Sequence, residues 1–579
     1  KLIKESLGVD VDFSQVSIED PKTYEKLCHG DTVGVFQLES GGITEMTMRL
    51  RPNRFEDLVA ILALYRPGPL DAGMVDRYIE RKHGREELVY EHPRMEKYLS
   101  DTYGIILYQE QIMQLAQELA GYSLAEADLL RRAMGKKIPE EMAKQRKRFL
   151  SGAIEREISE KTANVIFDQM ETFARYGFNR SHSAAYAMIS FQTAYLKTHY
   201  QVQFMAALMS NEMDDSDKVL KNLNECRKQG VLVLPPDANQ STAQFSVEKN
   251  SIRYGLSAVK GIGDKAVQSI IAARSKRKPF KDLEDFIMRV DLKSINKRVV
   301  EGLIKCGAMD FSPQSRRDLL ERSEIVLKAG QAYHREKESS QVSLFAGGSE
   351  GVPPIARLQT NKPEWPINKK LAFEREALGF YISGHPLEKF KHYLVKQNIV
   401  STSKIKNREN GDKVKIAGVV TALKLKNTKK GDRYATFTLE DWQGTVEALV
   451  WPDTYQKIAH LIVADDPVLV SGKADITEER CSLVIDSMES LIELRDKSAS
   501  EGVLVINGEQ QVEDKIDQLQ EIFKLHAGRC PVKARAKTKT GEVFIELRYS
   551  DKDPVLVDPS EELCDKVEQV FGRPVLFFV

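Results

Sequence analysis

The chain has 579 residues, enough for several domains with separate hydrophobic cores. Its 85 lysine and arginine residues balance 85 aspartate and glutamate residues, so the net charge indicates no nucleic-acid partner, and such a partner must meet local basic patches. The six cysteines form no C-x-x-C pair, which argues against a zinc site and a disulfide framework and predicts a protein of the reducing cytoplasm. No apolar run approaches the roughly 18 residues of a membrane helix, and no signal peptide is expected.

Residues 1–210 show helical periodicity almost throughout. Apolar side chains recur at helical spacing before Gly121, which can end that helix. Ser123 and Glu126 have the spacing of a capping box for the next helix, and Pro139 suits the first turn of a third. Core packing explains these apolar stripes, so the region is predicted to be a mostly helical domain.

The most basic segment of this region lies between residues 128 and 150, where eight cations face three carboxylates. Arg131 and Arg132 end one predicted helix, and Lys136 and Lys137 follow it. Planar guanidinium groups and point-like ammonium groups can together clamp a triphosphate. Cations that only stabilise a helix C-terminus would give the same pattern, and the residues leave both interpretations open.

A second candidate anion site lies at the start of a helix near residue 180. Asn179, Arg180 and His182 stand at that start, and Tyr186 follows His182 by four residues, on the same helix face. The free N–H groups of a helix start can bind an anion. An ordinary N-cap ahead of a buried helix explains the same residues.

Residues 211–335 are predicted to form a second, smaller helical domain. An apolar helix, the glycines Gly261 and Gly263, and a second apolar helix give the pattern of a helix-hairpin-helix. Such glycines let backbone N–H groups approach a phosphate, and Lys260 and Lys265 flank the turn. The alternative is a purely structural hairpin. A similar helix–loop pattern downstream suggests that the motif is paired.

Residues 336–409 turn polar and then proline-rich, which is typical of a linker, and a connecting helix follows. Within this linker Leu344 and Phe345 stand among serines, glycines and glutamates, three residues after Gln341. Two neighbouring large apolar residues in a polar linker suggest an interaction site, although a chance pair is the alternative.

Residues 410–495 change from helical to alternating periodicity. Three strands, a helix and two strands follow one another in the order of an OB barrel, a fold that commonly binds single-stranded nucleic acid with cations and stacked aromatics. Tyr434 and Trp442 are the candidate stacking residues, and a solvated turn is the alternative explanation of the basic hairpin. The first hairpin of the barrel carries Lys424, Lys426, Lys429, Lys430 and Arg433.

Residues 496–579 are predicted to form a small α+β domain. Near the other end of the chain, Asp10 and Asp12 alternate as the carboxylates of a two-metal site can. No third carboxylate can be placed with them from spacing, so no metal ligand and no catalytic residue is assigned in this chain.

Several long stretches of the first 210 residues resemble the bacterial DNA polymerase III alpha subunits, which are replicative C-family DNA polymerases. These stretches are GVFQLES, LYRPGPL, RKHGRE, TYGIILYQEQIM, LRRAMGKK and GFNRSHSAAYA. The resemblance runs to the end of the chain, where the last eighty residues match only in position and general pattern.

The resemblance implies a C-terminal portion of such a polymerase, from the fingers onward. In the family the three palm aspartates that hold Mg²⁺ lie upstream of the segment that Lys1 begins, so the chain by itself is expected to be inactive in DNA synthesis. The implied domains are 1–210 fingers with the end of the palm connection, 211–335 clamp-binding domain with helix-hairpin-helix, 336–409 linker with clamp-binding motif and connecting helix, 410–495 OB-fold, and 496–579 tau-binding-like α+β domain.

The resemblance also implies partners and residue roles. The partners are template-primer DNA, deoxynucleoside triphosphates, the beta sliding clamp and the tau subunit. Arg131 and Arg132 become the main candidates for the incoming triphosphate, and Tyr186 lies near the base. A non-catalytic DNA and clamp adaptor and a relative of tRNA synthetases remain the alternatives. The further candidates are Lys136, Lys137, Asn179, Arg180 and His182 for the nucleotide, Lys260, Gly261, Gly263 and Lys265 for duplex DNA, the five hairpin cations for single strands, and Gln341, Leu344 and Phe345 for the clamp.

Overall fold

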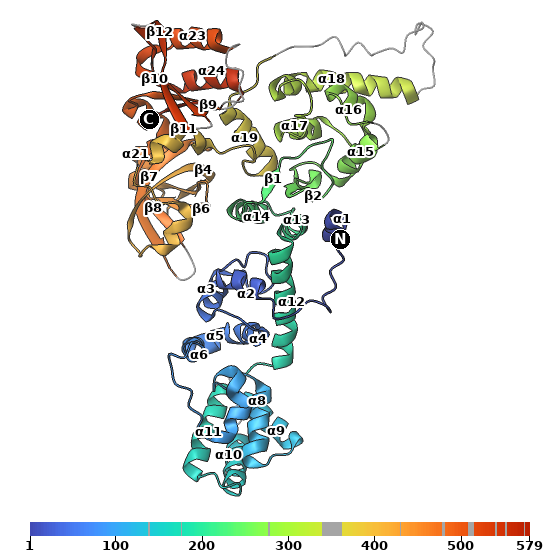
Figure 1. Cartoon of the computed structure of the whole chain (residues 1–579), viewed down its shortest axis with the longest axis vertical. Coiled ribbons are helices and arrows are strands. Elements are labelled where there is room, and N and C mark those ends of the chain that lie inside the picture. The colour runs from blue at the N-terminus through green and yellow to red at the C-terminus, as the bar shows by residue number, and fades with distance from the viewer. Residues whose placement is uncertain are drawn as a thin grey trace. The chain divides into compact units, whose positions relative to one another are not determined.

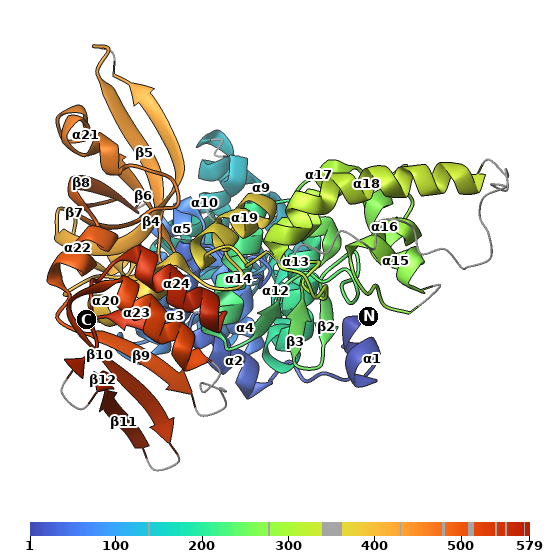
Figure 2. The same cartoon turned by 90° about the horizontal axis from the view of Figure 1, so that it is seen from above.

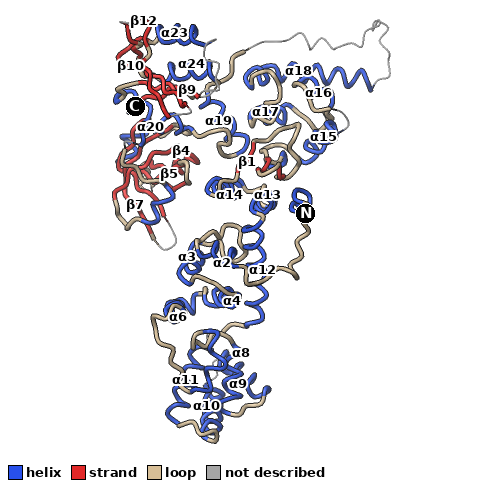
Figure 3. The backbone as a smooth tube through the Cα atoms, in the orientation of Figure 1, coloured by secondary structure: helices blue, strands red, loops and turns tan. Residues whose placement is uncertain are grey.

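The computed structural model divides the chain into two compact units, Lys1–Leu208 and Met209–Val579. Within the described residues the first unit is helical and every named strand belongs to the second (Figures 1 and 3). The predicted fold class, helical regions followed by a β-barrel and a small α+β domain, is confirmed. The structure describes residues 1–136, 139–174, 177–275, 278–338, 362–395, 397–428, 430–477, 481–507, 515–538, 541–550, 553–572 and 574–579.

The first unit contains two hydrophobic cores. One gathers α2, α3, α4 and α6 around the twenty-residue helix α12, and the other is formed by α8, α9, α10 and α11. The α-helices of this part are α1 (Leu2–Leu7), α2 (Pro21–Cys28), α3 (Gly41–Leu50), α4 (Phe55–Leu64), α5 (Pro67–Asp71), α6 (Met74–Lys82), α7 (Glu96–Leu99), α8 (Gln109–Ala120), α9 (Leu124–Lys136), α10 (Pro139–Ile154), α11 (Glu160–Ala174), α12 (Arg180–His199) and α13 (Gln201–Asn211).

Local signals in the sequence set the ends of the α8 and α9 helices. Gly121 follows α8 with a φ of 68°, a left-handed conformation that suits glycine. The capping box before α9 forms as predicted, because the Ser123 N–H donates to Glu126 Oε2 at 2.7 Å and the Glu126 N–H donates to Ser123 Oγ at 3.3 Å.

The second unit begins with a helical region around a small three-stranded sheet of order β1-β3-β2. The apolar helix predicted before Gly261 is wrong, because only a short 3₁₀ turn, Leu256–Ala258, precedes that glycine. The elements here are α14 (Ser216–Lys228), β1 (Leu232–Leu234), β2 (Ser246–Glu248), β3 (Ser251–Arg253), α15 (Asp264–Ser275), α16 (Leu283–Arg289), α17 (Lys297–Lys305), α18 (Arg316–Glu338), α19 (Ile367–Leu378) and α20 (Lys391–Val395).

Helix α18 is the longest of this region and packs against α16 and α17. Its first turn is held by residues that lie beyond the segment 339–361. The Arg316 N–H donates to Glu364 Oε2 at 3.0 Å, and the Ser315 hydroxyl donates to the Lys362 carbonyl at 2.8 Å. The chain therefore comes back to the start of α18 at Lys362.

A closed five-stranded barrel of order β4-β5-β6-β8-β7 follows. The predicted order of three strands, a helix and two strands is confirmed. The outer part of the β4–β5 hairpin extends beyond the rest of the barrel (Figure 2). The elements are β4 (Lys413–Asn427), β5 (Arg433–Glu440), β6 (Thr445–Val450), α21 (Pro452–Ile458), β7 (Pro467–Ile476), β8 (Cys481–Ser490) and α22 (Leu491–Ser498).

The last part of the chain is an α+β domain built on a sheet of order β11-β10-β9-β15. The helix α23 connects the parallel strands β9 and β10, and α24, which the sequence pattern did not predict, packs with α23 over the same core. The elements are β9 (Gly502–Asn507), α23 (Ile516–Leu525), β10 (Ala527–Thr538), β11 (Gly541–Glu546), β12 (Arg548–Ser550), β13 (Asp553–Pro554), β14 (Leu556–Val557), α24 (Glu561–Phe571) and β15 (Leu576–Phe578).

A buried ion-pair network joins α24 to the 3₁₀ turn Pro386–Phe390. Lys389, only 5% exposed, lies 2.9 Å from a Glu561 oxygen, 2.8 Å from one of Asp565 and 3.4 Å from one of Glu568. Burial raises the pKa of Glu561, but the Lys389 ammonium and the Arg495 guanidinium outweigh it and hold that pKa below its ordinary value. Among the described residues, none of the helices has the length and apolar character needed to span a bilayer.

Candidate nucleotide and nucleic-acid interfaces

Arg131 and Arg132 are both held by one carboxylate on their own helix, α9. Arg131 donates to Asp128 Oδ1 at 2.8 and 2.9 Å, and Arg132 lies 2.8 Å from Asp128 Oδ2. The hydrogen bonds from Arg131 hold the pKa of Asp128 below its ordinary value, so this anchor stays charged at neutral pH. The Arg132 side chain remains 62% exposed, which leaves donors of its guanidinium for a ligand.

Gln109 connects this pair of arginines to the second predicted segment. Its side-chain oxygen accepts a hydrogen bond from Arg131 at 3.2 Å, and its Nε2 donates to the Gly177 carbonyl at 3.0 Å. Its backbone N–H also donates to the Phe178 carbonyl at 2.9 Å. Gln109 at the start of α8 therefore links Arg131 of α9 to the residues just before α12, although the two segments lie about fifty residues apart. The prediction that Arg131 and Arg132 end their helix is wrong, because α9 continues to Lys136.

The start of α12 has the predicted N-cap and an aromatic row behind it. Asn179 Oδ1 accepts the His182 N–H at 2.8 Å. The His182 ring lies 5.4 Å from the Phe178 ring and 4.4 Å from the ring of Tyr186, centroid to centroid. The Tyr186 ring in turn lies 5.4 Å from that of Phe36. The rings are inclined to one another by 44° to 66°, so a base could stack on the exposed face of one ring and not on the row as a whole.

Arg180 is less well placed for a triphosphate than the sequence predicts. Its backbone N–H donates to both Glu110 carboxylate oxygens, at 3.1 and 3.2 Å, and its guanidinium lies 5.8 Å from the centre of the Tyr108 ring. It lines a cavity of about 420 Å³ that Glu56, Asp101 and Glu110 also line. Three carboxylates around one arginine oppose an anion.

Other cations of the basic segment serve the fold of the first unit. Arg146 pairs with Asp168 and Glu171, and Arg148 donates to the carbonyls of Ala120 and Gly121. Arg146 and Arg148 therefore stabilise the fold and are not available to clamp a triphosphate. Lys136 ends α9, but its side chain lies outside the described atoms, as does all of Lys137.

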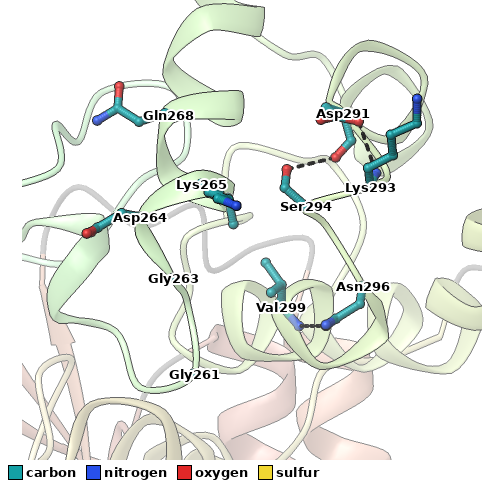
Figure 4. Close-up of a pocket in the computed structure, with 11 residues that line it drawn as sticks. Gly261, Gly263, Asp264, Lys265, Gln268, Asp291, Lys293, Ser294, Asn296 and Val299 are labelled. Carbon is teal, nitrogen blue, oxygen red and sulfur yellow. Dashed lines mark hydrogen bonds between the residues drawn. The ribbon is translucent and has the colours of Figure 1, made fainter.

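The predicted hairpin forms one wall of a cleft of about 730 Å³ (Figure 4). Gly261, with a φ of +79°, Gly263 and Lys265 line this wall. The other wall is the loop between α16 and α17, as the paired helix–loop pattern suggested. The lining residues on this side are Asp291, Lys293, Ser294 and Asn296 of the loop and Val299 of the first turn of α17.

Two helix starts open onto this cleft, those of α15 and α17. The Asp291 N–H donates to Ser269 Oγ at 2.8 Å, which ties the second loop to α15. A Cβ added at Gly263 would meet no atom within 4 Å, so the backbone there is open to a ligand. Helix starts, exposed backbone and the lysines Lys265 and Lys293 suit a phosphate backbone.

Lys260 does not line the cleft. Its N–H donates to the Ala377 carbonyl at 2.8 Å, and its ammonium lies beside Gly379, so it joins the hairpin to α19 instead. Lys293 and Asn296 were not singled out from the sequence. Asn296 could have been found as the N-cap residue of the second helix, and Lys293 as a cation three residues before that N-cap.

The barrel hairpin presents its cations to solvent. Lys424, Lys426, Lys430 and Arg433 are exposed, and none of them forms an ion pair with another residue in the described parts of the chain. Lys429 lies outside the described residues.

Of the two candidate stacking residues, Trp442 does not lie beside Tyr434 in the structure. The Trp442 ring lies 5.7 Å from that of His385 and packs against a buried cluster, so it is a core residue of the barrel region. Trp451, which the sequence analysis passed over, lies 6.2 Å from Tyr434, ring centre to ring centre, and is 51% exposed. Its place directly after β6, in register with the basic hairpin, is the signal that was missed.

The clamp candidates Gln341, Leu344 and Phe345 lie outside the described residues. Across the described part of the chain no group of three or more histidine, cysteine, aspartate or glutamate side chains could hold a metal ion. Asp10 pairs with Lys4 at 2.7 Å, and Asp12 accepts the Ser14 N–H at 2.9 Å. The described residues therefore do not fit a two-metal site.

Three family models match the chain, one in each of these regions. Residues 1–157 match the bacterial DNA polymerase III alpha subunit finger domain. Residues 230–319 match a helix-hairpin-helix motif, and residues 414–491 an OB-fold nucleic acid binding domain. The fold and these modules define a modular DNA-binding protein with polymerase fingers.

Curated relatives cover nearly the whole chain. DNA polymerase III subunit alpha of Vibrio cholerae is 38% identical over 568 residues, that of Thermus aquaticus 41% over 562 and that of Escherichia coli K12 39% over 568. These alignments cover 95–96% of this chain and 45–49% of the relatives. The chain is therefore similar, over nearly its whole length, to a C-terminal portion of the bacterial DNA polymerase III alpha subunits. It spans about half the length of the curated relatives it matches.

One similar solved structure covers a small part of the chain. A mitochondrial single-stranded DNA binding protein of S. cerevisiae, Rim1, is 17% identical and covers 14% of this chain and 97% of its own, with a TM-score of 0.13. A likeness at that score adds nothing to the argument.

Proposed function

We propose that this chain supplies the nucleotide-facing, DNA-binding and clamp-binding parts of a replicative DNA polymerase. The observation that carries the proposal is the link through Gln109, which holds Arg131 and the start of α12 in one arrangement within a fingers domain. The reaction is attack of a primer 3′ hydroxyl on the α-phosphorus of a deoxynucleoside triphosphate, with release of pyrophosphate.

In this proposal the two arginines of α9 offset negative charge on the triphosphate. Arg132 is the better candidate for direct contact because most of its side chain is exposed, whereas Arg131 is fixed by Asp128 and Gln109. His182 and Tyr186 offer the ring surface for the base. Groups fixed in advance cost little reorganisation when charge develops on the leaving phosphates.

DNA meets the chain at two further places in this proposal. The glycine-rich cleft between α15 and α17 takes the duplex backbone without reading sequence, and the barrel hairpin takes a single strand. Residues 341–345 bind the beta sliding clamp through Leu344 and Phe345, and the last domain binds the tau subunit. No disulfide joins the six cysteines, all of which lie in the described residues, and this suits work in the reducing cytoplasm.

The Mg²⁺ ions of the reaction need ligands from outside the described residues, because these residues do not fit the metal site. We therefore propose that the chain by itself binds substrates and does not join them.

The test is a nucleotide-binding titration on the purified chain. A deoxynucleoside triphosphate should bind, and its affinity should fall at least about tenfold in Arg132→Ala, the loss of one charge-assisted hydrogen bond. The matched control is Lys147→Ala, an exposed lysine of the same basic segment. Equal affinity in both variants and the original chain would refute the assignment of Arg132.

A further inference from the structure

The outer face of β4, β5 and β6 forms a ladder of paired residues whose chemistry changes along the barrel. Directly paired residues of antiparallel strands share a face, and the residues between them, such as Phe437 and Ala448, belong to the core. The outward rungs, in order from the hairpin, are Lys426–Tyr434, Lys424–Thr436–Leu449, Thr421–Thr438–Glu447 and Glu440–Thr445.

The hairpin end of this ladder carries two aromatic rings. Trp451 follows β6 directly, one residue beyond the Ala435–Val450 pair, and its ring plane is inclined by 30° to that of Tyr434. Trp451 is also the N-cap residue of α21, and its carbonyl accepts the Tyr455 N–H at 2.8 Å. The backbone of Trp451 is therefore fixed between a strand and a helix, while half of its side chain stays exposed.

The same end carries the cations that have no carboxylate partner among the described residues, Lys424, Lys426, Lys430 and Arg433. In the whole hairpin from 424 to 433 the sequence has five cations and one carboxylate, Asp432. Leu425, between two of the lysines, is 54% exposed. Phosphates can approach here without displacing an existing ion pair.

The opposite end of the ladder is acidic and faces α14. Glu440, 7% exposed, and Glu447 line a cavity of about 1000 Å³ together with Asp217 of α14. The cavity also has Lys221 and Arg375 in its lining, but Arg375 is engaged in an ion pair with Asp465. Burial raises the pKa of Glu440, and the charges of Arg375 and Arg227 oppose this rise.

We infer that the barrel face binds a short, unpaired stretch of nucleic acid, with a base stacked on Trp451 and Tyr434 and phosphates on the hairpin lysines, and that the site ends at the Glu447 rung. This inference rests on the proposed function of the barrel hairpin and adds to it the stacking residues and the length of the site. From the Tyr434 rung to the Thr438 rung is about 14 Å along the strand. The site therefore falls at the lower end of the roughly 4–16 nucleotides that OB folds bind.

The first experiment measures binding of labelled oligo(dT) to the full chain by fluorescence anisotropy. Trp451→Ala should weaken binding about 5- to 150-fold, the range expected for one lost stacking contact. Trp451→Phe keeps an aromatic face and should retain most of the affinity, whereas Trp451→Leu keeps apolar bulk and should not. Loss of binding in Ala and Leu with rescue by Phe supports stacking, and equal binding in all three overturns it.

A second measurement does not depend on a variant at Trp451. In the chain with Trp365→Phe and Trp442→Phe, Trp451 is the remaining tryptophan. Oligo(dT) should quench its emission and shield it from acrylamide. An emission and an acrylamide accessibility that stay constant while the oligonucleotide saturates the protein would place the bases elsewhere and overturn the inference.

The length of the site has its own test. Affinity should rise with oligo(dT) length up to about four nucleotides per barrel and then level off. Glu447→Lys should move that plateau to longer oligonucleotides, and an unchanged plateau would overturn the acidic boundary. The double variant Lys424→Glu with Lys426→Glu distinguishes failure of the proposed function from failure of the stacking inference. If it also leaves binding unchanged, the barrel is not a DNA site and the proposed function fails there. If it abolishes binding but Trp451→Ala does not, only the stacking inference fails.

Discussion

At the scale of single residues, the structure separates cations that hold the fold from cations that are available to a ligand. Arg146 and Arg148 belong to the first kind, since their guanidinium groups are taken up by carboxylates and carbonyls. Arg132 and the hairpin lysines belong to the second. The sequence could not make this distinction, because the partners Asp168, Glu171 and Ala120 lie twenty or more residues away.

In the full-length polymerase, Arg132→Ala should raise the KM for the incoming nucleotide about 10- to 100-fold, because a charge-assisted hydrogen bond contributes roughly 1.5–3 kcal/mol. The melting temperature should stay within about 1 °C, since the side chain is largely exposed. Steady-state primer extension with Lys147→Ala as the control measures the effect. A KM equal to that of the control would make Arg132 a helix-end cation only.

At the scale of elements, periodicity and turn residues predicted much of what the structure contains. The helices on either side of Gly121 and the order of elements in the barrel could be predicted from the sequence, because helix caps and alternating strands are local signals. The core role of Trp442 could not be predicted, since it depends on a distant partner, His385. The α24 helix was missed although its local signals are present: Ser560 caps its start, and Gly572, with a φ of 71°, ends it. The cleft needed the structure, because its second wall comes from a loop thirty residues downstream.

For the cleft between α15 and α17, Lys265→Glu with Lys293→Glu should weaken duplex DNA binding and lower the log–log salt dependence by about 0.9 for each lost phosphate contact. Lys281→Glu, an exposed lysine outside the cleft lining, is the matched control. Electrophoretic titration of a duplex at several salt concentrations gives both numbers. A slope unchanged in the double variant would exclude the cleft as the phosphate site.

Gly263→Val should also weaken duplex binding without changing the melting temperature, because a side chain there projects into open space. Gly261→Val should lower the melting temperature, since φ at that position is +79°, a conformation that a β-branched residue disfavours. Calorimetry of each single variant therefore separates a binding effect from a folding effect. A lower melting temperature in Gly263→Val together with an unchanged one in Gly261→Val would contradict the hairpin geometry.

The ion-pair network around Lys389 should make the packing of α24 against the 3₁₀ turn Pro386–Phe390 sensitive to mutation and to acid. Lys389→Met should lower the free energy of unfolding by about 3–5 kcal/mol, because it leaves buried carboxylates without their cation. Glu561 has a depressed pKa in the folded state, so its contribution is present above about pH 4.5, its ordinary pKa, and is lost as pH falls through the folded value. Urea unfolding at pH 7 and pH 4 should show a smaller acid loss in Glu561→Gln than in the original chain.

At the scale of the whole molecule, the chain gathers several binding modules and no recognisable centre for the chemical step among its described residues. The sequence motifs through residue 210 indicated the polymerase family, and the relatives at 38–41% identity support it. Binding modules linked in one chain raise one another's effective concentration on DNA, so each can be modest in affinity.

The purified chain should not extend a primer in the presence of Mg²⁺, because Asp10 and Asp12 are engaged with Lys4 and Ser14 and no third carboxylate joins them in the described residues. Gel analysis of primer extension at high protein concentration is the measurement. Extension that disappears in Asp10→Asn or Asp12→Asn would show that these two carboxylates hold a catalytic metal after all.

Leu344→Ala with Phe345→Ala should abolish binding to the beta sliding clamp and leave the melting temperature unchanged. Each anchor contributes roughly 1.5–3 kcal/mol when buried, so losing both removes a peptide contact of modest affinity. Calorimetric titration with the clamp measures binding, and Gln341→Ala should give a smaller loss. Undiminished binding in the double variant would place the clamp contact elsewhere.

The chain returns to the start of α18 at Lys362, so the length of this helix separates the two ends of the segment 339–361. The proposed clamp peptide begins at Gln341, three positions along the sequence from Glu338, the last residue of the helix. The helix itself is about 34 Å long and packs on α16 and α17, which flank the loop that lines the DNA cleft. Each turn added to α18 or removed from it would shift the end of the helix by about 5.4 Å, so under the proposed function the length of this one helix would limit the distance between the cleft and a bound clamp.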